Sequence, residues 1–363
     1  MTIRLKMIRL LYMNETNLTP RQKVILNLIN QSNGLFREGI QNEVKKFYKI
    51  SKPTLIRDLT GLIEKRLIRV GGKGKNTQYF SYSRNSLLKY FDIDQYFVIG
   101  PDERIKARKV FDFGIFNKLK NLFSQIETER IEKVQKSFLK QTQKLSSGIL
   151  KKELERFIIE LSWKSSKIEG NTYTLLETEN LVKENKEAKG RSQEEAIMIL
   201  NHKNTFEQIL KNRLKFKELK LSEINQLHNL MTKNLNISPG IRKQAVGVTG
   251  TVYEPLDNEF QIQEAMERLV HLINNTKNVL DKALIANSMI SYIQPYVDGN
   301  KRTGRMLTNA LLLSYNYYPL SYRSINEEEF KKALILFYEQ GSIYHLKKLF
   351  IEQLVFAYKT YFK

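Results

Sequence analysis

The sequence predicts a mainly α-helical protein whose N-terminal unit ends in a β-hairpin. Three observations support this class. Apolar residues recur at three- and four-residue spacing along most of the chain after residue 146, and a hydrophobic content of 41% is ample for buried cores. Two short β-prone runs, 67–70 and 78–82, are joined by a Gly/Lys turn. Because 363 residues exceed one average domain, we expect units at 1–90, 91–145 and 146–363.

The first ninety residues contain three helical patterns and one hairpin. "LTPRQKVILNLINQ" begins with Thr19 as an N-cap before Pro20, and "FREGIQNEVKKFY" repeats the helical spacing. Ser51 then opens "KPTLIRDLTGLIEKRLI", and "LIRVGGKGKNTQYFSYS" supplies the hairpin with a cationic tip. Three helices followed by such a hairpin are the parts of a winged helix-turn-helix domain.

In a domain of this kind the third helix can enter the DNA major groove while the hairpin tip reaches phosphates. The predicted DNA contacts are Lys52, Thr54, Arg57 and Lys65 on the helix, and Lys73 and Lys75 on the tip. A net charge of +22 favours a polyanionic partner through counterion release. A solvated lysine coat would give the same charge, so a unit used only for protein contact stays the alternative.

Composition excludes several other classes. The chain has no cysteine, which rules out a disulfide framework and a thiolate metal site. No run of about 18 uncharged apolar residues is present, so no membrane span is expected. The start "MTIRLKMIRLLYMNET" is too short and too charged for a secretory signal, and we expect a cytoplasmic protein. Residues 91–145 read as a helical connector that packs against its neighbours.

The helical pattern of residues 146–363 has one exception. "RKQAVGVTGTVYEPL" is rich in β-branched residues and contains Gly247 and Gly250, which predicts a small hairpin. The apolar stripes after residue 330 predict terminal helix packing or a homodimer surface.

The stretch "QPYVDGNKRTGR", residues 294–305, is built to bind an anion. Apolar residues continue it as a helix from Met306, so free backbone N–H groups and the positive end of the helix dipole point outward at its start. Arg302 and Arg305 share one helical face and can hold successive phosphates. Asp298 can hold a magnesium ion against those phosphates. The remaining predicted contacts come from Gly299, Asn300, Lys301 and Gly304, the glycines allowing close backbone approach.

This loop resembles the signature of the Fic (Fido) family, His-Pro-Phe-x-Asp-Gly-Asn-Gly-Arg-x-x-Arg. The matching residues are Pro295, Asp298, Gly299, Asn300, Arg302 and Arg305, with Tyr296 in place of Phe. "LSEINQLHNLMTKNLNISPGIRKQAVGVTGTVYEPL" resembles the family's preceding helix, its Gly-x-x-Arg turn, here one residue shorter, and the flap hairpin that aligns a target segment. The flap residues implied are Val248, Thr249, Gly250 and Tyr253.

Upstream, "SSKIEGN" resembles the family's inhibitory helix motif, which places that helix near 160–172. The motif residues are Ser165, Glu169 and Gly170. The alternative is an ordinary helix that stops at Gly170 and leaves Glu169 solvated. The resemblance implies a Fic-type helical bundle with a small β-hairpin flap. It also implies Mg-ATP as substrate, transfer of AMP to a hydroxyl of an unknown target protein, and inhibition by Glu169 through Arg305.

Two departures from the signature bear on activity. Gln294 stands where the family has its catalytic histidine, and the loss of a general base typically costs about 10²–10⁴ in rate. Lys301 stands where glycine is usual and resembles the Doc branch, which phosphorylates its target. His228 is expected to be structural, and His202, His271 and His345 lie in helical patterns without a motif.

Three interpretations therefore remain open. The first is an autoinhibited protein adenylyltransferase that is slow or inactive. The second is a nucleotide-sensing pseudoenzyme that regulates transcription, and the third is a Doc-like protein kinase.

Overall fold

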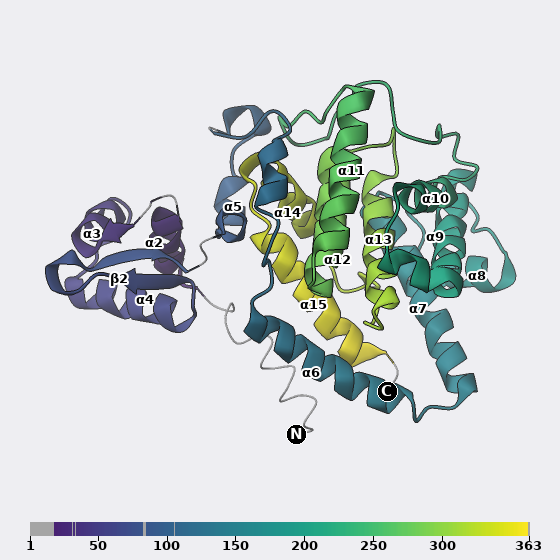
Figure 1. The fold of residues 1–363 in the computed structure, drawn as a ribbon, viewed down its shortest axis with the longest axis horizontal. Helices are drawn as coiled ribbons and strands as arrows, with labels where there is room; N and C mark the ends of the chain where they lie inside the picture. Colours follow the sequence, from purple (N-terminus) through teal and green to yellow (C-terminus); the bar gives the residue numbers. More distant parts are fainter. Residues whose placement is uncertain (1–17, 31, 33, 83–84, 105, 362–363) are drawn as a thin grey trace.

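The computed structural model describes residues 18–30, 32, 34–82, 85–104 and 106–361 and is mainly helical (Figure 1). The predicted start of the chain, residues 1–17, lies outside the described residues. The N-terminal unit joins three helices to one three-stranded antiparallel sheet of order β1-β3-β2. Its elements are α2 (Pro20–Asn30), β1 (Leu35–Phe36), α3 (Arg37–Lys45), α4 (Lys52–Glu64), β2 (Ile68–Gly71) and β3 (Gln78–Ser81).

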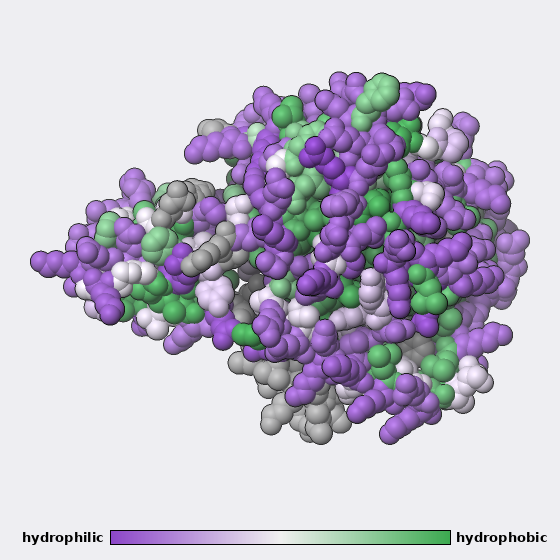
Figure 2. Space-filling model, viewed as in Figure 1, coloured by the Kyte–Doolittle hydropathy of each residue, from purple (hydrophilic) through white to green (hydrophobic). Residues whose placement is uncertain are grey.

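Local sequence explains how this unit forms. The Ser51 hydroxyl accepts from the Thr54 backbone N–H at 3.3 Å and caps α4, and Pro53 occupies the first turn. Aliphatic residues of the helices and of β2 form a core of their own, separate from the core of the remaining chain. Arg21 of α2 pairs with the buried Asp58 of α4 at 2.5 Å and ties the two helices together. Figure 2 shows that hydrophilic residues cover most of this face of the molecule.

The rest of the chain is a helical body around one large core. Its helices are α5 (Ile93–Tyr96), α6 (Gln125–Thr142), α7 (Ser147–Ile168), α8 (Leu175–Glu184), α9 (Gln193–Asn212), α10 (Leu221–Met231), α11 (Glu259–Asn275), α12 (Val279–Ile293), α13 (Asn300–Ser314), α14 (Glu327–Gln340) and α15 (Tyr344–Thr360). Short 3₁₀ turns lie at η1 (Gly74–Asn76), η2 (Ser86–Leu88), η3 (Pro101–Glu103), η4 (Phe113–Asn117) and η5 (Arg213–Lys217).

The consecutive helices α12 and α13 form the centre of the body and are buried almost throughout (Figure 1). Gly304 allows them to approach closely, because a Cβ at this position would lie 3.2 Å from the Asn287 carbonyl oxygen of α12. Gly304 was predicted to bring backbone close to a phosphate. In the structure the side-chain position of Gly304 faces α12, which gives this glycine a role in helix packing.

The segment between the N-terminal unit and α6 packs on the C-terminal helices. The Ile343 N–H donates to the Leu87 carbonyl, and the Ser342 hydroxyl donates to the Lys89 carbonyl. Residues of this segment and of α6 belong to the same hydrophobic core as α11–α15. The apolar stripe of α15 also lies in that core, which agrees with terminal helix packing as its role. No described helix combines the length and the hydropathy that crossing a bilayer requires.

The small hairpin predicted within 242–256 is not formed. This described segment contains no paired strands, only an isolated bridge between Val110 and Glu254. Side chains satisfy its backbone instead: Arg242 donates to the carbonyls of Gln294, Gln244 and Leu256. The β-branched residues favour an extended backbone, but this segment has no neighbouring strand to pair with and therefore forms no hairpin.

We predict that Gly304→Ala destabilises the body by about 1–3 kcal/mol, because the added methyl group overpacks the α12–α13 contact. Gly148→Ala in α7 is the matched control, since nothing lies within 4 Å of its Cβ position and the gain in helix propensity is at most about 1 kcal/mol. Urea denaturation of both variants measures the difference. A Gly304→Ala protein as stable as Gly148→Ala would contradict this account of the packing.

Candidate functional site

The loop 294–299 connects α12 to α13 and is held rigidly by its neighbours. Gln294 ends α12 in the left-handed region, with φ 51° and ψ 57°, and its carbonyl accepts from Arg242 Nε at 2.7 Å. The Asn300 amide binds Tyr296 on both sides, accepting from its N–H at 2.9 Å and donating to its carbonyl at 2.8 Å. The Asn300 side chain therefore fixes the conformation of the loop. Only its backbone N–H remains available to a ligand.

His228 of α10 packs against the same loop and is hydrogen-bonded to it. Its ring stacks on Tyr296 with a centroid separation of 3.7 Å, and Nε2 donates to the Asp298 carbonyl at 3.0 Å. Burial lowers the pKa of His228 and favours the neutral ring, whose Nε2–H tautomer makes this bond. This position agrees with the structural role predicted for His228. Gly299 adopts φ +80°, and a Cβ there would lie 3.0 Å from Thr232.

Arg302 is buried on the first turn of α13, and one nitrogen of its guanidinium has no hydrogen-bond partner among the described residues. Nη2 donates to Asp298 Oδ2 at 2.9 Å, whereas Nη1 is buried without a hydrogen-bond partner among the described residues. Burial lowers the pKa of Arg302, and the nearby Arg305 adds to this effect. A buried guanidinium with an unsatisfied N–H is costly, so the arrangement favours an anion at this point.

Arg305 lies one turn further along α13 and is fully buried. Nη1 donates to Glu169 Oε1 at 2.8 Å, Nη2 donates to the Ser165 carbonyl at 2.8 Å, and Nε donates to Ser165 Oγ at 2.9 Å. Ser165 and Glu169 are both at the C-terminal end of α7, where Gly170 follows with φ +101°. The structure thus brings together the three residues of the predicted inhibitory motif and the second arginine of the loop.

Glu169 stays ionised in this environment. Burial raises the pKa of its carboxyl, but the charges of Arg305, Lys301 and Arg302 outweigh burial and hold the pKa below its ordinary value. The side chain is 18% exposed, and Lys301 is half-buried. The Glu169 carboxylate therefore lies in the positive field of three cations from the first two turns of α13.

His202 of α9 is a functional position that the sequence alone did not reveal. Its Nδ1–H donates to the Met198 carbonyl at 2.8 Å, so Nε2 accepts from the Ser165 hydroxyl at 2.8 Å. The Ser165 oxygen, with its proton directed to His202, presents its lone pairs to Arg305 Nε. Burial lowers the pKa of His202 to about 3. The only sequence signal was a histidine at helical spacing, which gives no information about the helix it faces.

Gln294 stands at the position of the catalytic histidine in the Fic signature, and a glutamine side chain cannot act as a base. The Gln294 amide donates through Nε2 to the Ser291 carbonyl at 2.7 Å and is largely buried. The hydroxyl of the buried Tyr338 has its pKa raised by burial and by the charge of Glu169. Neither residue can accept a proton at neutral pH.

The predicted flap residues do not form one surface over the loop. Tyr253 is buried, stacks on Tyr292 and donates to its carbonyl at 2.7 Å. The Gly250 carbonyl accepts from Arg104, Val248 packs partly on the core, and Thr249 is exposed. Tyr253 is therefore a core anchor rather than a flap residue. Sequence alone does not separate these two roles, because a buried aromatic residue and a flap residue look alike in a β-prone stretch.

Four of the predicted DNA contacts, Lys52, Arg57, Lys73 and Lys75, are exposed on α4 and at the tip of the β2–β3 hairpin. Thr54 is half-buried, and its hydroxyl lies 2.9 Å from the Ser51 hydroxyl in the cap of α4. Lys65 lies at the C-terminal end of α4, where it lines a cleft against the helical body.

The geometry as a whole defines a helical protein with a loop of clustered cations at a buried helix start. Residues 218–312, which include the loop, match the model of the Fic/DOC family. Protein adenylyltransferase Fic of Drosophila grimshawi is 30% identical over 159 residues, which cover 42% of this chain and 32% of that protein. Its Drosophila melanogaster counterpart is 26% identical over 178 residues, 48% of this chain and 36% of that protein. The match thus spans about a third of the length of these relatives.

Solved structures with the same fold include Fic-1 of C. elegans, with a TM-score of 0.56, 15% identity and coverage of 94% of this chain and 98% of that chain. A Fic family protein of Desulfovibrio desulfuricans aligns with a TM-score of 0.54 and 18% identity, over 66% of this chain and 75% of that chain. Residues 218–312 thus resemble the Fic/DOC family, and the structural neighbours share the fold of the chain.

We predict that His202 makes stability depend on pH below neutrality. The unfolded histidine binds a proton near pH 6.5, whereas the folded one resists protonation down to about pH 3. The unfolding free energy therefore falls as pH drops below 6.5, by up to about 1.4 kcal/mol per pH unit. His202→Gln removes this contribution, and urea titrations between pH 7 and 4.5 measure the slope. The exposed His271→Gln on α11 is the control, and equal slopes in the two variants would refute the assignment.

Proposed function

We propose that the loop 294–305 binds the phosphates of ATP and that Glu169 restrains this binding. The observation that carries the proposal is the fully buried Arg305 guanidinium, whose anionic partner is the Glu169 carboxylate at 2.8 Å. A phosphate oxygen can replace a carboxylate oxygen on a guanidinium with the same geometry. The unpartnered Arg302 Nη1, one turn earlier on α13, offers a second donor for the neighbouring phosphate.

Two further groups would complete the site. The first-turn N–H groups of α13, including that of Asn300, add the positive end of the helix dipole. The Asp298 carboxylate is exposed at the mouth of the loop, as a magnesium ligand must be when the ion is shared with nucleotide phosphates. No group of three or more acidic or histidine side chains among the described residues is arranged to hold a metal ion, so phosphate oxygens and water would supply the other ligands. Magnesium would neutralise phosphate charge.

The reaction that this site suits is transfer of AMP to a protein hydroxyl. The hydroxyl oxygen forms a bond to the α-phosphorus, the bond between that phosphorus and the bridging oxygen breaks, and pyrophosphate leaves. A base must take the hydroxyl proton. Because Gln294 cannot do so, we propose that this chain binds Mg-ATP and that its transfer activity is weakened or lost. A nucleotide-sensing role without turnover is the alternative.

We predict that Glu169→Gly increases Mg-ATP affinity at least about tenfold, because Arg305 loses the carboxylate that competes with phosphate. Isothermal titration calorimetry measures the affinity. Glu179→Ala is the matched control, since this α8 carboxylate pairs only with Lys183 among the described residues. Absence of ATP uptake by Glu169→Gly would overturn the proposal.

We predict that Glu169→Gly/Gln294→His transfers label from α-³²P-ATP to protein about 10²–10⁴ times faster than Glu169→Gly, because it regains a general base. Autoradiography after incubation with cell extract measures transfer. Equal rates in both variants would show that another base acts or that no transfer occurs. Label from γ-³²P-ATP alone would instead identify a kinase of the Doc type.

We further propose that the N-terminal unit is a winged helix that binds DNA. Three helices, a sheet of order β1-β3-β2 and a hairpin with an exposed cationic tip support this. Thirteen Lys and Arg against four Asp and Glu across residues 18–82 give the unit a strongly positive field. The first half of α4, which includes the exposed Lys52 and Arg57, would enter the groove.

We predict that Lys52→Ala and Arg57→Ala each weaken binding to duplex DNA and reduce the salt slope of binding by about 1, since each removes one cation from the surface that would face the DNA. Fluorescence anisotropy over a salt series measures both quantities. Lys136→Ala on α6 removes an exposed cation of the helical body and serves as the control. Equal losses in all three variants would mean that net charge, not α4, determines binding.

A further inference from the structure

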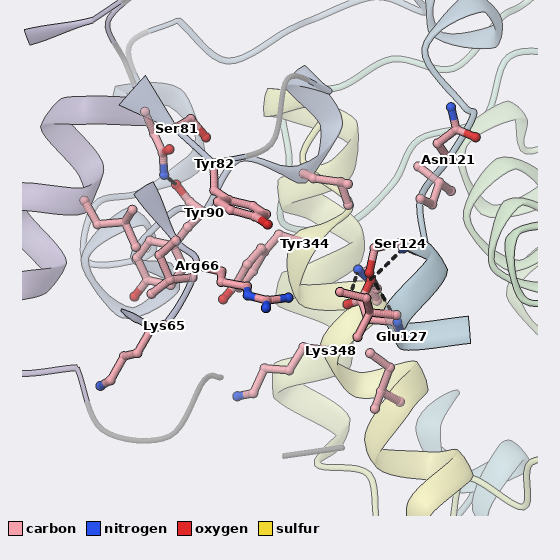
Figure 3. A pocket seen from close by; sticks show the side chains of 18 of the residues that line it. Lys65, Arg66, Ser81, Tyr82, Tyr90, Asn121, Ser124, Glu127, Tyr344 and Lys348 are labelled. Carbon is pink, nitrogen blue, oxygen red and sulfur yellow. Dashed lines mark hydrogen bonds and ion pairs between the residues drawn. The ribbon is translucent and has the colours of Figure 1, made fainter. Parts of the chain in front are cut away.

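A cleft of ≈ 270 Å³ lies between the N-terminal unit and the helical body (Figure 3). None of its lining residues belongs to the loop 294–305. One wall consists of the C-terminal end of α4 and the base of the β2–β3 hairpin, and the other consists of α6 and α15. This volume is close to the lower end of the range for small-molecule sites.

Positive charge dominates the walls of this cleft. The cations among the described lining residues are Lys65, Arg66, Arg130, Lys347 and Lys348, and the only acid among them is Glu127. Glu127 is already paired with Lys347 at 2.6 Å and bonded to the Ser124 cap of α6. Like charges that converge in a confined space repel one another, so an anion in the cleft would stabilise the arrangement.

Arg66 is positioned to take part in such binding. It follows α4 in the left-handed region with φ 54°, an uncommon conformation for a residue with a long side chain. Figure 3 shows its guanidinium reaching from the N-terminal unit into the same space that Lys348 enters from α15. The side chain of Arg66 is exposed, and it makes no hydrogen bond or ion pair within the described part of the chain.

Aromatic and polar groups add a second recognition feature. The ring of Tyr82, which is 49% exposed, lies at the cleft beside Tyr90 and Tyr344 (Figure 3). A tyrosine face of this kind can stack on a planar base. Asn30 also lines the cleft, is 3% exposed, and holds an Oδ1 atom without a hydrogen-bond partner among the described residues, while its Nδ2 donates to the Tyr90 carbonyl. A buried acceptor that lacks a donor favours a ligand that brings one.

We propose that this cleft binds a small nucleoside phosphate, with Arg66 and Lys348 on the phosphate and the Tyr82 ring against the base. Such a ligand touches both the N-terminal unit and α15, so its binding fixes how the two units are oriented. The cleft is thus an effector site through which a nucleotide controls the orientation of the cationic α4 surface. It uses none of the residues that bind the loop phosphates.

Photolabelling with 8-azidoadenosine 5′-monophosphate tests this site on the full chain. We expect label in peptides that contain Tyr82, Tyr90 or Tyr344, mapped by mass spectrometry, and competition by unlabelled AMP but not by adenosine. Arg66→Glu/Lys348→Glu should reduce that label at least about tenfold, because it replaces two charge-assisted contacts with repulsion. Lys136→Glu/Lys140→Glu on the exposed face of α6 is the charge-matched control.

The outcome separates this site from the loop. Label within residues 294–305 reports on the loop alone and is expected to be equal in the wild type and in both double variants. Label confined to that loop, equal losses in both double variants, or competition by adenosine as strong as by AMP would each overturn the proposal. Displacement of the label by duplex DNA but not by AMP would assign the cleft to nucleic acid instead.

Discussion

The buried guanidinium of Arg305 is the constraint on which the rest of the site depends. A cation with no solvent exposure needs an anion, and removing one partner from such a pair typically costs about 3–5 kcal/mol. Glu169 supplies that anion from a different helix, α7, and the Ser165 hydroxyl and carbonyl occupy the other two donor positions. The proposed binding of a phosphate at Arg305 would therefore exchange one anion for another on the same guanidinium.

The proposed exchange requires donors that are already oriented, and the contacts around the loop provide that orientation. His202 orients the Ser165 hydroxyl, Asn300 fixes the loop backbone, and the His228 ring fills the space under Tyr296. Each of these contacts is made inside the protein, where a misplaced polar group has no water to replace its partner. A donor aimed at a phosphate must already point in the right direction before the ligand arrives.

The two halves of the molecule are built on different physical principles. The helical body relies on one large apolar core, in which α12 and α13 are central, and on buried polar contacts. The N-terminal unit has a small core of its own and a strongly cationic surface. Polar contacts tie the N-terminal unit to the segment that follows it: the Asn30 amide donates to the Tyr90 carbonyl, and Lys23 pairs with Asp92 and Asp94. The cleft at Arg66 lies beside these contacts.

The sequence by itself determined the helical class and the position of the loop, whereas the pairing of Glu169 with Arg305 was expected only from the family resemblance. The first two features are local: a periodic apolar pattern and a helix start with clustered cations, whose residues are neighbours along the chain. Tertiary structure decided what each side chain faces. Gly304 packs on α12, and Tyr253 belongs to the core. Residues 242–256 form no paired strands, and His202 contacts Ser165. These contacts join segments distant in sequence and depend on packing that periodicity does not encode.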